Sequence, residues 1–264
     1  MCSSDLVDYP PVFLYEYGIV GRIFQALYPT YPDGLPLLVA IKLPILAANI
    51  ALAALFYVTV RRVSGDVQAA RWSAVAYWVN PAMIFGGEML GYVDALYFVP
   101  AMAGIILAHA GRPVWGGVLV GLAVATKPQG ILMGPAFALA LWQGGGLPAV
   151  VMAGVAFSAT VGAAIGPYAA KGALPNMWLA FGSFDERRDT MSAYATNIGW
   201  LINWYLRSSF GVPELGYRAF FQFVTRPLAI SRFVELGYPN PRPIGRLAVI
   251  AATLWALWKT RASK

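Results

Sequence analysis

Long apolar runs alternate with short breaks of charge, glycine or proline along most of this chain. The runs approach the length that a helix needs to cross a lipid bilayer. They cover residues 36–60, 72–86, 93–110, 113–143, 147–168 and 244–259. The pattern predicts an all-α fold, built as a polytopic transmembrane helical bundle.

Composition supports a membrane protein and narrows its partners. Hydrophobic residues make up 59% of the 264 residues and charged residues 12%, which is too apolar for a soluble domain of this length. The partner we expect first is therefore the lipid bilayer. The formal charge is +7, but the basic residues gather at helix ends and in loops, so we expect an anionic lipid or a phosphate-bearing substrate and no nucleic acid. Cys2 and His109 are alone of their kinds, which excludes a disulfide framework and disfavours a Cys/His metal site.

Charge also predicts which loops face the cytoplasm. Arg61, Arg62 and Arg71 place residues 61–71 inside, so the segment from Asp8 to Asp33 and the turn at 87–91 lie outside. Asp8 and Asp94 then share the outer face. We expect residues 170–243 to form a long outer loop with interfacial helices, although the basic residues at 171–188 mildly favour the opposite side.

Residues 113–143 allow two interpretations. They could form one kinked helix, or two short helices broken at Lys127-Pro128-Gln129. Proline removes a backbone hydrogen bond and a lysine is costly at mid-bilayer, so a break that turns Lys127 toward a watery cavity is reasonable. Two helices would keep the 170–243 region outside.

The first six residues look foreign to the protein. Cys2-Ser3-Ser4-Asp5-Leu6 is what a common short-read sequencing adapter encodes in this frame. We therefore expect residues 1–6 to be adapter-derived and residues 7–264 to be a single transmembrane domain, itself a fragment that lacks an earlier helix; the alternative is a chance match in a genuine N-terminus.

Acidic residues on the predicted outer face are candidates for chemistry. Asp8-Tyr9-Pro10-Pro11 could simply start a helix, with the prolines in its first turn. Glu88 and Asp94 could likewise cap a helix at a membrane-surface turn. Acidic groups gathered on one face are also what a general base or a metal site needs, so both interpretations stay open.

Lys127 stands out because its ammonium lies inside an apolar stretch. It could snorkel to the interface, but the proline and the Gln129 amide that follow favour contact with an anion such as a phosphate. Asn197 and Trp200, in the predicted outer loop, could be interfacial anchors or part of a site.

In this order the motifs resemble those of the GT-C-type membrane glycosyltransferases. The likeness is nearest to the polyprenyl-phosphate-sugar-dependent mannosyl- and glucosyltransferases, whose pattern commonly reads DYPP, then NP with GQxDAL, then KPQ. It extends from Asp8 to about Trp204. The matching residues are Asp8–Pro11, Asn80-Pro81, Gly91–Leu96, Lys127–Gln129, Asn197 and Trp200.

The resemblance implies a reaction and roles for these residues. A hexose of the mannose or glucose type would move from a polyprenyl-phosphate donor to a glycan, lipid or protein acceptor, outside a bacterial or archaeal plasma membrane. Asp8 and Asp94 would be catalytic. The substrate-binding set would be Tyr9, Glu88, Tyr92, Lys127, Gln129, Asn197 and Trp200.

Two departures from that pattern limit the expectation. Tyr92 stands where the family usually has Gln, and the usual general base lies upstream of DYPP, where this chain offers only Asp5. We therefore expect the 264-residue chain to be inactive by itself. No resident cofactor is implied, although Asp8, Glu88 and Asp94 could support a divalent cation.

Two other classes of function compete with a transferase. A transporter or flippase for a lipid-linked or anionic solute would use Lys127 and a broken helix as a midplane site. A structural membrane subunit would leave the order of the motifs as coincidence. Separate substitution of Asp94 and Lys127 in the full-length protein distinguishes a transferase from a structural subunit, because the transferase should lose turnover while still folding and the subunit should be unaffected.

Overall fold

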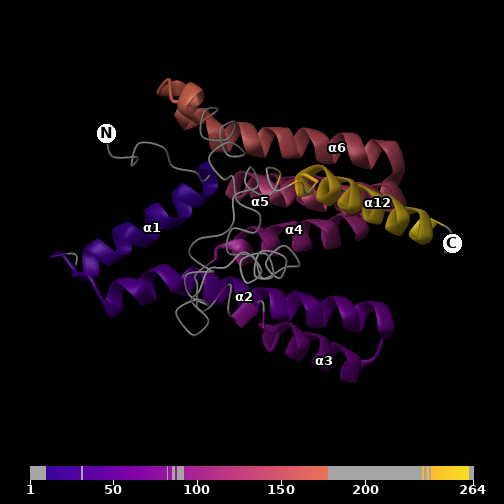
Figure 1. The fold of residues 1–264 in the computed structure, drawn as a ribbon, viewed down its shortest axis with the longest axis horizontal. Helices are drawn as coiled ribbons and strands as arrows, with labels where there is room; N and C mark the ends of the chain where they lie inside the picture. Colours follow the sequence, from indigo (N-terminus) through magenta and orange to yellow (C-terminus); the bar gives the residue numbers. More distant parts are fainter. Residues whose placement is uncertain are drawn as a thin grey trace. The chain divides into compact units, whose positions relative to one another are not determined.

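The computed structural model describes residues 10–30, 32–81, 83–84, 87, 92–177, 234, 237 and 239–261. The chain divides into two compact units, Met1–Met177 and Trp178–Lys264. All regular structure in the described residues is helical, which confirms the all-α prediction (Figure 1). The first unit contains α1 (Pro11–Leu27), α2 (Leu35–Ser64), α3 (Val67–Trp78), α4 (Asp94–His109), α5 (Pro113–Thr126), the 3₁₀ helix η3 (Pro128–Met133) and α6 (Gly134–Ala170), and the second contains α12 (Pro241–Arg261).

Helix α1 begins where the double proline predicts a helix start. Pro11 is its first residue and Pro10 its N-cap, so the missing proline N–H groups fall where a helix leaves its donors unpaired anyway. The helix is tied to two others by tyrosine hydroxyls. Tyr15 donates to the Ala164 carbonyl of α6, and Tyr17 donates to the Ile41 carbonyl of α2, both at 3.1 Å.

Helices α2 and α3 form a hairpin of unequal arms. Gly65 takes the left-handed conformation that closes α2, and the Asp66 side chain accepts the Gln68 N–H at 2.7 Å to cap α3. Helix α3 has only 12 residues and ends at Trp78, well short of the predicted run to residue 86. The nearby Pro81 explains the early end, because a proline disfavours the helical conformation in the residue before it.

Between α5 and α6 the chain turns back on itself, which decides the open question over residues 113–143. Gly130 lies against the Ala123 backbone, and further from the break Phe137 lies with its ring against Gly116. Each step forward on one arm is thus a step backward on the other. The segment is two short antiparallel helices, broken at Lys127, and not one kinked helix.

The chain turns a second time inside α6, at Gly146, whose positive φ of 64° interrupts the helical backbone. This is the boundary expected between the runs 113–143 and 147–168. Beyond it, Gly117 lies against Ala153 and Gly121 against Phe157, so the second arm of α6 runs parallel to α5. The end of α6 therefore lies at the same end of this unit as Lys127.

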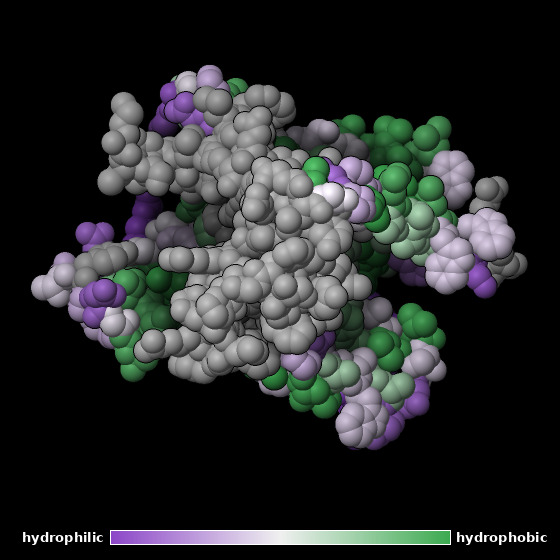
Figure 2. Space-filling model, in the orientation of Figure 1, coloured by the Kyte–Doolittle hydropathy of each residue, from purple (hydrophilic) through white to green (hydrophobic). Residues whose placement is uncertain are grey.

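By length and composition alone, two helical segments could cross a membrane: α2, and the stretch Pro128–Ala170, which turns back on itself at Gly146. Both segments expose large hydrophobic side chains on the protein surface, and so does α12 (Figure 2). The exposed ones include Leu38, Leu43 and Ile50 on α2, Trp142, Val151 and Val155 on α6, and Leu247, Leu254 and Trp258 on α12.

Candidate functional site

An ion pair joins two of the predicted site residues. Lys127 follows the last residue of α5, where its extended backbone (φ −153°, ψ 129°) turns the chain away from the helix. Asp94 is the first residue of α4. The Lys127 Nζ donates to Asp94 Oδ1 across 33 residues of sequence. The Lys127 side chain is 17% exposed and that of Asp94 47%, so the carboxylate is the half of the pair that faces outward.

Asp94 pairs with Lys127 instead of capping α4. The N-cap position belongs to Val93, with no side-chain hydrogen bond there. A carboxylate in the first turn still interacts favourably with the helix dipole. The capping interpretation of Asp94 was therefore wrong.

An aromatic ring supports the ammonium from another side. Lys127 Nζ lies 5.8 Å from the centroid of the Tyr97 ring, within range of a cation–π interaction. Tyr97 lies three residues after Asp94, and residues at that spacing share one helix face. The first turn of α4 thus supplies both partners of Lys127.

Gln129 lies in η3, and its side-chain amide oxygen accepts no hydrogen bond. Its Oε1 atom is buried without a hydrogen-bond partner. A Cβ on the next residue, Gly130, would approach the Ala123 backbone to 2.9 Å, so glycine allows η3 to lie against α5 at this point. A buried amide oxygen without a donor costs free energy that a ligand hydroxyl or N–H could recover.

The predicted residues divide into those brought together and those outside the described part. Asp94 and Lys127 meet, and Gln129 lies two residues after Lys127 in the first turn of η3. Tyr92 is partly buried two residues before Asp94. The other predicted residues fall outside the described ranges: Asp8, Tyr9, Glu88, Asn197 and Trp200. So do the adapter-derived segment and most of the expected outer loop at 170–243.

A divalent cation finds no ready site in the part of the chain that the structure describes. No group of three or more His, Cys, Asp or Glu side chains there could hold a metal ion. Of the three carboxylates considered for a cation, only Asp94 lies within these ranges, and it is paired with Lys127.

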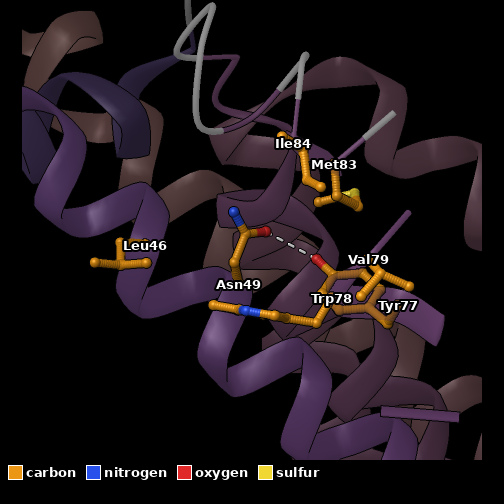
Figure 3. Close-up of a pocket in the computed structure, with 7 residues that line it drawn as sticks. All are labelled: Leu46, Asn49, Tyr77, Trp78, Val79, Met83 and Ile84. Carbon is orange, nitrogen blue, oxygen red and sulfur yellow. Dashed lines mark hydrogen bonds between the residues drawn. The ribbon is translucent and has the colours of Figure 1, made fainter. Parts of the chain in front are cut away.

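A pocket of about 300 Å³ lies beside α2 and the end of α3, and the apolar pattern of the sequence did not predict it. At its polar edge, the Tyr77 hydroxyl donates to Asn49 Oδ1 at 2.8 Å (Figure 3). Asn49 is 2% exposed, and a lone amide within the apolar run 36–60 is the signal that could have revealed the site. The lining residues are Leu46, Asn49, Tyr77, Trp78, Val79, Met83 and Ile84.

Glu16 is a second group that the sequence did not single out. It lies on α1 between the two tyrosines that tie this helix to α6 and α2, and its Oε2 is buried without a hydrogen-bond partner. Burial raises the pKa of Glu16 to about 7. The sequence signal is a carboxylate inside a helix that is otherwise mostly apolar.

No protein-family model, curated protein sequence or solved structure matches the chain. The functional argument therefore depends on the residues themselves and on the order of their motifs.

Proposed function

We propose that this chain is part of a membrane glycosyltransferase. It would transfer a hexose, of the mannose or glucose type, from a polyprenyl-phosphate donor to a glycan, lipid or protein acceptor on the extracytoplasmic face. The observation that carries the proposal is the ion pair between Asp94 and Lys127. Two motifs that are separate in the sequence meet in one place.

The exposed apolar side chains support a position in the bilayer. Large hydrophobic residues cover the outer faces of α2 and α6, which a soluble monomer would rarely leave in water. Hydrocarbon would solvate them instead. The remaining helices then complete the polytopic bundle that the sequence predicts.

Helix length would set the depth of the site. Helices α4 and α5 have 16 and 14 residues. At a rise of 1.5 Å per residue they span only about 24 and 21 Å, less than a hydrocarbon core of about 30 Å. If the His109 end of α4 and the Pro113 end of α5 lie near the cytoplasmic surface, the opposite ends of both helices lie below the outer surface. Asp94 and Lys127 would then line a depression into which a lipid-linked phosphate can descend from the bilayer.

The groups present suit the departure of a phosphate from a sugar. In the reaction, the bond from the anomeric carbon to the phosphate oxygen breaks, the acceptor oxygen bonds to that carbon, and the acceptor proton passes to a carboxylate base. Lys127 would stabilise the negative charge on the departing phosphate. The Gln129 Oε1 atom would accept a hydrogen bond from a hydroxyl group of the sugar donor. Asp94, released from Lys127 when the phosphate binds, would be free to contact the sugar or the acceptor.

Donor binding tests the proposal without requiring a complete active site. The chain is placed in lipid nanodiscs and titrated with a polyprenyl-phosphate mannose. We expect Lys127→Ala to weaken binding at least tenfold, since charge-assisted hydrogen bonds to phosphate are among the strongest. Arg62→Ala is the matched control, because it removes the same charge from the last turn of α2 and is not part of the Asp94–Lys127 pair. Equal affinities for the wild type and Lys127→Ala would refute the proposal.

A transporter or flippase remains the second candidate, because the helix break at Lys127 is also typical of transporter binding sites. Proteoliposomes separate the two. A flippase moves a labelled polyprenyl-phosphate sugar across the membrane in the absence of any acceptor, whereas a transferase binds it on one side only.

A further inference from the structure

The two partners of the Asp94–Lys127 ion pair differ in how firmly they are held. The Lys127 side chain is 17% exposed, and its backbone is fixed on both sides. Its N–H donates to the Ala123 carbonyl at 3.0 Å, and its carbonyl accepts the Gly130 N–H at 2.9 Å. The ring of Tyr97, only 7% exposed, lies 5.8 Å from its ammonium. These contacts position Lys127 independently of Asp94.

Asp94 is held much less firmly. Its side chain is 47% exposed, and in the part of the chain that the structure describes its carboxylate accepts a hydrogen bond from Lys127 only. It lies in the first turn of α4, where the helix dipole stabilises a carboxylate whether or not a cation is bound to it. Asp94 can therefore leave Lys127 and be hydrated, whereas the mostly buried ammonium then needs another anion.

The Asp94 carboxylate already occupies the place of an anion. Its oxygen contacts the Lys127 ammonium as the anionic oxygen of a ligand would, and it belongs to the same chain, so its effective concentration there is high. The other neighbour of the ammonium is an aromatic ring, which attracts a cation but does not neutralise its charge. A ligand anion therefore competes with Asp94 for a single ammonium.

We propose that Asp94 is a built-in competitor at this anion site: it closes off Lys127 in the free protein, and the phosphate of the ligand has to displace it. The inference rests on the proposed function, which supplies the phosphate, and adds how the site is regulated. Asp94 lowers the affinity of the site for phosphate. Once the sugar has been transferred, it returns to Lys127 and so speeds release of the phosphate.

Removal of the carboxylate tests the inference. Asp94→Asn is titrated with decyl phosphate in maltoside micelles, which contain no phosphate of their own. We expect the Kd to be about tenfold lower than that of the wild type, because no ion pair has to be broken before the ligand binds. Asp33→Asn is the matched control and should leave the Kd unchanged, since it removes the same charge from an exposed aspartate outside the pair.

A second variant keeps the test decisive if Asp94→Asn folds poorly. Asp94→Ser also removes the carboxylate, and serine, like aspartate, is common at helix starts. We expect the same gain in affinity, measured at a temperature well below the Tm of each variant. Lys127→Ala, added to either variant, should abolish the gain, because the ammonium for which the two anions compete is then absent.

The opposite results overturn the inference in distinct ways. Equal or weaker binding by the folded Asp94 variants would mean that Asp94 does not compete, or that it helps to hold the ligand. An equal gain in Asp33→Asn would mean that overall charge is the cause. In both cases the proposed function stands if Lys127→Ala alone still weakens binding. If Lys127→Ala binds decyl phosphate as well as the wild type, the proposed function falls and the inference falls with it.

Discussion

Helices α4, α5 and α6 pack much more closely than α2 and α3. In the first group, glycine brings backbone against backbone: Gly104 lies against the Gly116 carbonyl, and Gly117 against that of Ala153. Between α2 and the end of α3 there is instead a pocket of about 300 Å³. Small residues at helix interfaces are typical of membrane bundles. The close group fixes the Asp94–Lys127 pair, and the open group leaves room for a ligand.

The largest effect should come from forcing the close helices apart. A Cβ at Gly117 would lie 2.2 Å from the Ala153 carbonyl oxygen. We expect Gly117→Ala to lower the free energy of unfolding by about 2–3 kcal/mol, the usual cost of overpacking, and to lower the Tm in detergent. Gly154→Ala is the control, since nothing lies within 4 Å of its Cβ position. An unchanged Tm for Gly117→Ala would mean that this contact is not close in the protein.

Much of the close group could be predicted from the sequence. A proline and a lysine within an apolar run are local signals, so the break at Lys127 was one of the two interpretations considered. The pairing of Lys127 with Asp94 was not predictable, because the two residues lie 33 positions apart and meet only when α4 and α5 pack. Charge placed Asp94 on the outer face and the helix break turned Lys127 toward a watery cavity, but neither signal gave a distance between the two residues.

The open group was less predictable. The apolar run 72–86 suggested a longer helix than the 12 residues of α3, because hydrophobicity alone does not register where a helix must stop. The bond between Asn49 and Tyr77 depends on how two arms of a hairpin align. A one-residue change in that alignment would turn Tyr77 away from Asn49, and no local pattern fixes it.

A double-mutant cycle measures how firmly the close helices hold the ion pair. We expect Asp94→Asn and Lys127→Met to be coupled by about 1–2 kcal/mol in the free energy of unfolding. Asp94→Asn should cost more than Lys127→Met, since it leaves a mostly buried ammonium unpaired, whereas the half-exposed carboxylate can be hydrated. Strictly additive effects would show that the pair contributes nothing to stability.

On the open side, removal of one hydroxyl should have a smaller effect. Tyr77→Phe deletes the donor to Asn49 and should cost about 1 kcal/mol, typical of a single hydrogen bond. Tyr57→Phe is a matched control, because its hydroxyl contacts Arg61 at an exposed site and should matter less. Chemical denaturation of both variants provides the comparison. Equal losses would mean that the Asn49 site is as accessible to water as the surface.

The smallest effect should come from Glu16, on the helix that touches both groups. Its pKa is about 7 in the fold and 4.5 in the unfolded chain, so between these values the folded state binds more protons and stability falls as the pH rises. Glu16→Gln removes the titration. We expect it to raise the Tm slightly at pH 8 and to leave it unchanged at pH 4, where both side chains are neutral. Partial exposure should keep the gain below about 1 kcal/mol. A Tm difference that is the same at both pH values would mean that the Glu16 carboxylate is hydrated and that α1 packs loosely against its neighbours.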